Sequence, residues 1–178
     1  MQRQSYQHSR HSLRDFAAAG LAGSLAEVFW IMAFCAATGR SAIGVLREIT
    51  ATVLDGSADA AWAPAAGIAL HFLLGVLIAV AFGVVLRKGP LRNAGSPVQL
   101  AAALILLATI WVVNFFVVLP VLNPTFVTIV PLSASFVSKL LFGVAMALTL
   151  DAVSARMAWA RTLRSVLSAA GPGRTSSP

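Results

Sequence analysis

Four long apolar runs constrain this chain more than any other feature. A helix of about 20 apolar residues crosses the hydrocarbon core of a bilayer, so each run is long enough to span once. Only 11% of the residues are charged, whereas soluble domains carry about a quarter. The sequence therefore predicts an all-α, polytopic membrane protein, a bundle of four transmembrane helices. The expected spans are about 16–37, 65–86, 100–119 and 133–153 of the 178 residues.

The first run follows a basic tail, residues 1–15, as the apolar part of a secretory signal peptide also does. It is longer than the 7–15 residues typical of that part, and it contains Glu27. We therefore expect a retained transmembrane helix.

The loop at 38–64 contains apolar residues at helical spacing: Ile43, Leu46, Ile49 and Val53. Polar side chains stand between them, which is the pattern of a short amphipathic helix lying at the membrane surface. The segment 120–132 is apolar but contains Pro120, Pro124 and Pro131. Proline breaks helices, so we expect the third span to stop at Pro120 and a tight interfacial connection to follow.

Lysine and arginine alternate between the segments outside the spans. The five segments, in chain order, contain three, two, three, none and four of them. This alternation is the positive-inside pattern for four spans with both termini in the cytoplasm. The basic tail 154–178, partly disordered, would then be cytoplasmic. Topology also explains the net charge of +7, so we expect no nucleic acid as partner. The expected partner is the lipid bilayer. A homo-oligomer or a larger membrane complex is also possible.

Small residues recur every fourth position in three of the four spans. Such stripes let neighbouring helices approach closely, because small side chains keep the backbones from being held apart. The expected helix-packing residues are Gly23, Gly75, Ala79, Gly83, Gly143 and Ala147.

Four polar residues lie inside the expected spans: Glu27, His71, Asn114 and Lys139. Glu27 is nearest the midplane, about 15 Å from the outer end of its span. Ionisable groups at such depth are functional candidates and need a partner; the natural partner of Glu27 is Lys139 or His71. Two other interpretations stay open. Lys139 could extend to the headgroups, and His71 and Asn114 could serve only as interhelical hydrogen-bond donors.

No catalytic or cofactor motif is found in the sequence. A nucleophile elbow, a phosphate-binding loop and zinc-ligand spacing are all missing, and Cys35 is the single cysteine. We therefore expect no enzymatic activity, no cofactor and no metal.

The layout resembles small four-helix inner-membrane proteins of bacteria, including those similar to YagU. The resemblance rests on the long first loop, on Pro120 after the third span, and on the His71-x-x-x-Gly75 and Lys139-x-x-x-Gly143 spacings. Such proteins often have histidine where this chain has Lys139. The resemblance implies a bacterial inner-membrane location and no particular activity. Glu27 also gives a faint likeness to small multidrug transporters, which use a glutamate in the first of four helices.

Two functions follow as hypotheses. The first is a structural or accessory membrane component. The second is a small proton- or ion-coupled transporter or channel subunit that uses the polar cluster of Glu27, His71, Asn114 and Lys139.

Overall fold

The computed structural model describes residues 11–89, 91 and 95–169, and all its regular elements are helices. Four stretches are long and apolar enough to cross a membrane: α1, α3, the continuous run from α4 to α5, and α7. The predicted four-helix membrane bundle is therefore confirmed. In chain order the elements are α1 (Leu13–Thr38), α2 (Ala42–Val53), α3 (Ala63–Lys88), α4 (Ser96–Val113), the π-helical turn η2 (Asn114–Val118), α5 (Leu119–Leu122), α6 (Pro124–Ile129) and α7 (Leu132–Ala169).

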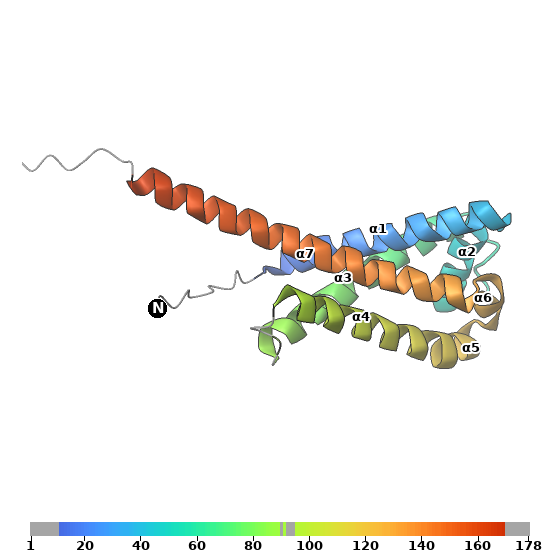
Figure 1. Ribbon diagram of the computed structural model, residues 1–178. Helices are drawn as coiled ribbons and strands as arrows, with labels where there is room; N and C mark the ends of the chain where they lie inside the picture. The colour runs from blue at the N-terminus through green and yellow to red at the C-terminus, as the bar shows by residue number, and fades with distance from the viewer. Residues whose placement is uncertain (1–10, 90, 92–94, 170–178) are drawn as a thin grey trace, which may run out of the picture.

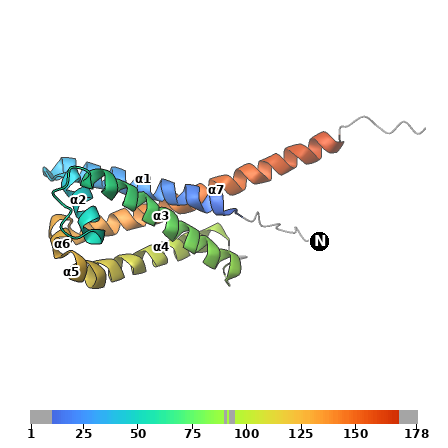
Figure 2. The same cartoon turned by 180° about the vertical axis from the view of Figure 1, so that it is seen from behind.

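The long helices run antiparallel along the chain (Figure 1). The start of α1, the end of α3, the start of α4 and the last part of α7 lie at one end, which we name the terminal end. The opposite end, named the α2 end, holds α2, α5 and α6 (Figure 2). Helix α1 packs against both α3 and α7, and α7 also packs against α4. Helices α3 and α4 meet at the terminal end and diverge toward the α2 end.

Glycines allow α1 and α3 to approach until their backbones touch. A Cβ on Gly20 would stand 2.7 Å from the carbonyl oxygen of Gly75 and 2.8 Å from the Cα of Val76. A Cβ on Gly83 would overlap the ring of Phe16, and one on Gly23 the ring of Phe142. Any larger residue at these positions would push the helices apart.

On α7 the closest contacts differ from the expected stripe. Gly143 faces α4, where an added Cβ would stand 3.1 Å from Leu104. Ala147 is only partly buried, while Met146 and Leu150 are buried in the main core. Gly143 therefore packs closely against α4 as a small residue, and large side chains fill the following turn of the α7 interface.

Two apolar cores lie at different heights in the bundle. The larger one joins α1, α3, α4 and α7 and includes Phe16, Phe82 and Leu150, which places it toward the terminal end. The smaller one, formed by Cys35, Val45 and Val130, lies at the α2 end. The polar residues of the spans fall between these cores.

Helix α2 is the short helix predicted in the first loop. It starts after the turn at Gly39, whose φ of 68° suits glycine, and Ser41 caps it by accepting a hydrogen bond from the N–H of Gly44. It packs mainly against α3. A Cβ on Gly67 would collide with the carbonyl oxygen of Leu46, so the two helices touch backbone to backbone.

The third spanning run continues past Pro120, so its predicted end at Leu119 was wrong. The N–H of Leu119 donates to the carbonyl of Asn114, five residues earlier, and forms the π-helical turn η2. Proline has no N–H and its ring clashes with the carbonyl four residues back. The wider π turn accommodates this, and the helix goes on to Leu122 before α6 begins.

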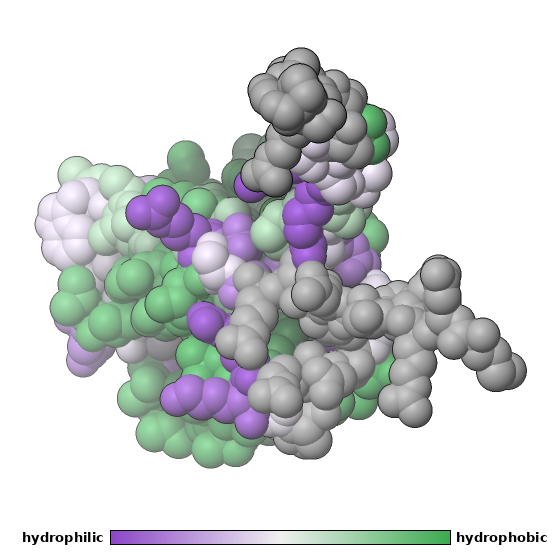
Figure 3. Space-filling view, turned by 90° about the vertical axis from the view of Figure 1, so that its left-hand side faces the viewer, coloured by the Kyte–Doolittle hydropathy of each residue, from purple (hydrophilic) through white to green (hydrophobic). Residues whose placement is uncertain are grey.

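Helix α7 extends well beyond the predicted end of its span at Val153. It continues to Ala169 and projects from the bundle at the terminal end (Figure 1). Residues 170–178, the rest of the predicted tail, lie outside the described residues. Figure 3 looks onto this end, where hydrophilic side chains lie within a more hydrophobic surround. Exposed basic residues near it are Arg14, Arg87, Lys88 and Arg156.

Candidate functional site

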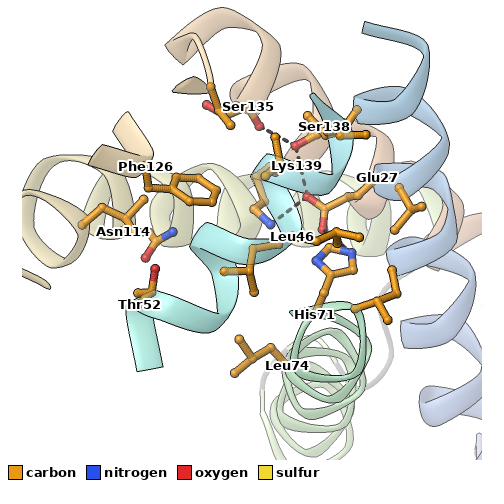
Figure 4. Close-up of a pocket in the computed structure, with 18 of the residues that line it drawn as sticks. Glu27, Leu46, Thr52, His71, Leu74, Asn114, Phe126, Ser135, Ser138 and Lys139 are labelled. Atoms are coloured by element: carbon orange, nitrogen blue, oxygen red, sulfur yellow. Dashed lines mark hydrogen bonds and ion pairs between the residues drawn. The ribbon is translucent and has the colours of Figure 1, made fainter. Parts of the chain in front are cut away.

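A cavity of about 380 Å³ lies in the half of the bundle toward the α2 end. Residues from α1, α2, α3, η2, α5, α6 and α7 line it, so all four spans contribute to its wall, the third one through η2 and α5. Its position follows from the divergence of α3 and α4, which α2 only partly fills. The four polar residues singled out in the sequence, Glu27, His71, Asn114 and Lys139, all line this one cavity (Figure 4).

Glu27 and Lys139 form an ion pair at one side of the cavity. Lys139 Nζ lies 2.7 Å from Glu27 Oε1, and the side chain of Glu27 is only 4% exposed. The lysine therefore points into the bundle and does not extend to the headgroups. The carboxylate is removed from water, whereas the lysine side chain keeps 20% exposure; removing an ion from water costs several kcal/mol unless it is well paired.

Two serines of α7 support the carboxylate of Glu27. The Ser138 hydroxyl lies 3.2 Å from Glu27 Oε1 and donates to the carbonyl of Ser135 at 2.7 Å. Ser135 in turn receives a hydrogen bond from Trp111 Nε1 at 2.9 Å. We did not single out these serines in the sequence, although their spacing of three places them on one face of α7 with Lys139 nearby.

His71 lies on the other side of the same carboxylate. Its Nε2 is 3.8 Å from Glu27 Oε2 and 3.2 Å from the carbonyl oxygen of Ser24. A carbonyl only accepts hydrogen bonds, so this contact places a proton on Nε2. Glu27 thus faces an imidazole from α3 and an ammonium from α7, and both predicted partners are present.

Asn114 lines the cavity from the start of the π-helical turn. Its side-chain amide makes no hydrogen bond to any described residue, and it has no direct contact with the Glu27 ion pair. In Figure 4 it lies across the cavity from His71, near Thr52 and Phe126. An unpartnered amide in an apolar surround leaves hydrogen-bonding capacity unused. The cavity therefore holds two kinds of polar group. The Glu27–Lys139 ion pair is satisfied within the protein, and the amide of Asn114 has no partner among the described residues.

The rest of the wall is apolar. The apolar residues of α2 that indicated a surface helix, Ile43, Leu46, Ile49 and Val53, also line the cavity. Several lining side chains are about half exposed: Met32 55%, Ile43 59%, Val53 58% and Leu74 50%. The cavity is therefore open to the outside of the bundle, and its opening is edged by apolar groups.

A second polar group anchors the α2 end. Asn123 is 6% exposed, and its Nδ2 lies within hydrogen-bond distance of Glu48 Oε2 (2.9 Å) and Thr52 Oγ1 (3.2 Å). Its Oδ1 accepts from the N–H of Phe126 at 3.1 Å. This residue ties α2 to α6, and we had not identified it in the sequence because it lies in the segment assigned as a connection.

Comparisons with protein-family models, with curated proteins and with solved structures find no match for this chain. Function is therefore inferred from the chemistry of the site. Within the described part of the chain, no three His, Cys, Asp or Glu side chains come together as metal ligands would. What the cavity offers is a carboxylate held between an ammonium and an imidazole, next to an apolar chamber.

Proposed function

We propose that this protein is a small proton-coupled transporter in which Glu27 takes up and releases the proton. The observation that carries the proposal is the position of the Glu27–Lys139 ion pair, which lines an open cavity and is not sealed within the packed core. Ionisable residues that face a cavity inside a membrane mark substrate and proton pathways.

Protonation of Glu27 would release Lys139. A neutral carboxyl no longer compensates the ammonium group, and a lone charge in a membrane interior is strongly unfavourable. The site must then bind a compensating solute or change shape. Proton uptake and solute binding are coupled in this way without further machinery.

Simple tethering of helices explains the ion pair less well. Replacing a buried ion pair by packed apolar residues is often neutral or stabilising. The glycine contacts of α1 and α3 already hold the bundle together at short range. A costly pair next to a cavity therefore points to a role beyond stability.

The test is uptake into proteoliposomes under an imposed pH gradient. Radiolabelled carboxylates, amines, amino acids and sugars form the panel. At least one solute should accumulate with wild-type protein and not with Glu27→Gln. The exposed carboxylate of Asp55 supplies the matched control, since Asp55→Asn should transport normally. If no uptake depends on Glu27, the proposal is wrong.

A structural or accessory role is the second candidate, and one observation favours it. The projecting part of α7 carries large apolar side chains with high exposure, Trp159 65% and Leu167 70%, which is a surface for a protein partner. In that case Glu27→Gln is silent in every transport assay, whereas Trp159→Ala weakens a complex detected by crosslinking.

We also propose a bacterial inner-membrane location with both termini in the cytoplasm. The exposed basic residues at the terminal end support this orientation. At the α2 end, Arg40 and Arg47 donate to the carbonyls of Ile129 and Ala58, so these two cations are engaged in holding loops.

A further inference from the structure

The polar residues that line the cavity include unused hydrogen-bond donors. Lys139 has three N–H groups, of which Glu27 occupies one. The amide of Asn114 donates to no described residue. Among the residues that line the cavity, Glu27 supplies the one carboxylate, and it is already paired with Lys139. A ligand bound here is therefore recognised through an acceptor group, and an anionic acceptor fits best because the unused donors include an ammonium.

The remaining wall fits an alkyl chain. Leu46 and Ile49 of α2 line the chamber together with Phe115, Leu119 and Phe126. The volume of about 380 Å³ falls in the range of small-molecule pockets. Since the opening is edged by half-exposed apolar side chains, a ligand with an apolar body reaches it from the hydrocarbon layer more readily than an ion does.

The ligand must arrive as a neutral acid, because an anion would change the net charge of the buried site. Glu27 faces His71 from α3 and Lys139 from α7, while Arg47 and Glu48 of α2 bond elsewhere. A neutral carboxylic acid enters from lipid and gives its proton to Glu27. The O–H bond of the ligand breaks, an O–H bond forms on Glu27, and the new ligand carboxylate takes the ammonium of Lys139. The net charge of the site does not change, so no uncompensated charge is buried.

We infer that the cavity binds a medium-chain carboxylic acid, with its carboxylate on Lys139 and its alkyl chain along α2. The inference rests on the proposed function, since it uses Glu27 as the proton acceptor. It names the substrate class of that site as anionic amphiphiles and excludes cationic ones, which Lys139 repels.

The experiment measures equilibrium binding of radiolabelled decanoate to the full-length protein in lipid nanodiscs. Decyltrimethylammonium and decan-1-ol serve as cationic and neutral probes of the same chain length, and empty nanodiscs correct for partition into lipid. The variants are Lys139→Gln, Glu27→Gln and the matched control Lys88→Gln, whose lysine is exposed at the terminal end of α3.

Decanoate should bind saturably, and Lys139→Gln should weaken it about tenfold or more, the effect of losing one charged hydrogen bond. Lys88→Gln should leave binding unchanged. Glu27→Gln should tighten decanoate binding and remove its pH dependence, because Lys139 then has no internal competitor. If Lys139→Gln does not fold, the charge-balanced double variant Glu27→Gln/Lys139→Gln takes its place and should also lose binding.

Two results would overturn the inference. One is saturable binding of decyltrimethylammonium that Glu27→Gln abolishes. The other is the lack of saturable decanoate binding at any pH where the protein is folded. Neither result bears on proton coupling, which fails only if uptake of every solute in the panel is independent of Glu27.

Discussion

Two asparagines show how differently the same side chain serves this molecule. Asn123 is buried and uses both ends of its amide, with Glu48 and Thr52 on one side and the N–H of Phe126 on the other. Asn114 is partly buried, and its amide bonds to no described residue. The first asparagine holds structure together, and the second is available to a ligand.

Substitution should separate these roles. Asn123→Ala removes hydrogen-bond partners from the part-buried groups of Glu48, Thr52 and Phe126, so it should lower the free energy of unfolding by about 1–3 kcal/mol. Asn114→Ala removes no internal hydrogen bond and should change it by less than about 0.5 kcal/mol. Thermal unfolding of the purified variants in detergent measures both. Equal destabilisation would show that Asn114 is also structural.

His11 stands at the terminal end, just before α1. Its Nε2 lies 3.1 Å from Ser154 Oγ and its ring meets Phe16 edge to face. Burial lowers the pKa of His11 below its usual 6.5, although Asp15 and Asp151 act in the opposite direction. Its Nδ1 is buried and makes no hydrogen bond to a described residue, so the charged form would leave an N–H unsatisfied.

Acidification should therefore destabilise the contact between the start of α1 and α7. With the folded pKa below the unfolded one, the unfolded state binds the proton first as the pH falls. The stabilisation is complete above pH 6.5 and is lost as the pH drops below that value toward the folded pKa. Melting temperatures of the wild type and His11→Gln at pH 7.5 and pH 5.5 test this. The difference between the two proteins should shrink at the lower pH, and a constant difference would contradict the assignment.

At the scale of elements, the docking of α2 on α3 shapes the cavity. Gly67 permits it, since a Cβ there would collide with the carbonyl of Leu46. Gly67→Ala should force the helices apart and cost about 1–3 kcal/mol. Gly44→Ala, where the nearest atom would be Ser41 Cβ at 3.4 Å, is the matched control and should be neutral or slightly stabilising. Thermal unfolding reports the difference, and similar melting points for both variants would show that α2 is not closely docked.

The sequence was sufficient to predict the spanning helices. It was insufficient to predict the π-helical turn in the third run and the cavity that α2 lines. Apolar run length identifies spans, because lipid admits little else than helices. The length of an apolar run does not reveal a π-helical turn. A proline in the sequence usually indicates the end of a helix, and here the turn lets the helix continue past Pro120. The divergence of α3 and α4 was equally hidden, so the sequence did not indicate that the apolar stripe of α2 also lines a cavity.

Part of the polar cluster was predictable, because lipid offers no hydrogen bonds to polar groups. A carboxylate near the midplane needs a partner, which indicated Lys139 and His71 for Glu27. The serines that support Glu27 were not indicated, because serine is common and cheap in transmembrane helices. The separation of Asn114 from the ion pair depends on the register that the turn at Asn114–Val118 imposes, and only the three-dimensional structure supplies it.

At the scale of the whole molecule, orientation in the membrane is open to direct measurement. We expect the connection after Gly89 and the end of α7 to face the cytoplasm, and the loop around Gly56 to face the other side. Paired reporter fusions at Gly89 and Gly56, one active only in the cytoplasm and one only outside it, give the answer. A non-cytoplasmic signal at Gly89 would reverse the assigned topology.

The central claim is that Glu27 exchanges a proton inside the cavity. Infrared difference spectroscopy of the reconstituted protein measures it directly through the carbonyl stretch of a protonated carboxylic acid. On acidification the wild type and Asp55→Asn should gain a band from a shielded carboxyl that Glu27→Gln lacks. If Glu27 instead remains a carboxylate at every pH at which the protein stays folded, its ion pair with Lys139 is a permanent structural link and the proposed coupling does not exist.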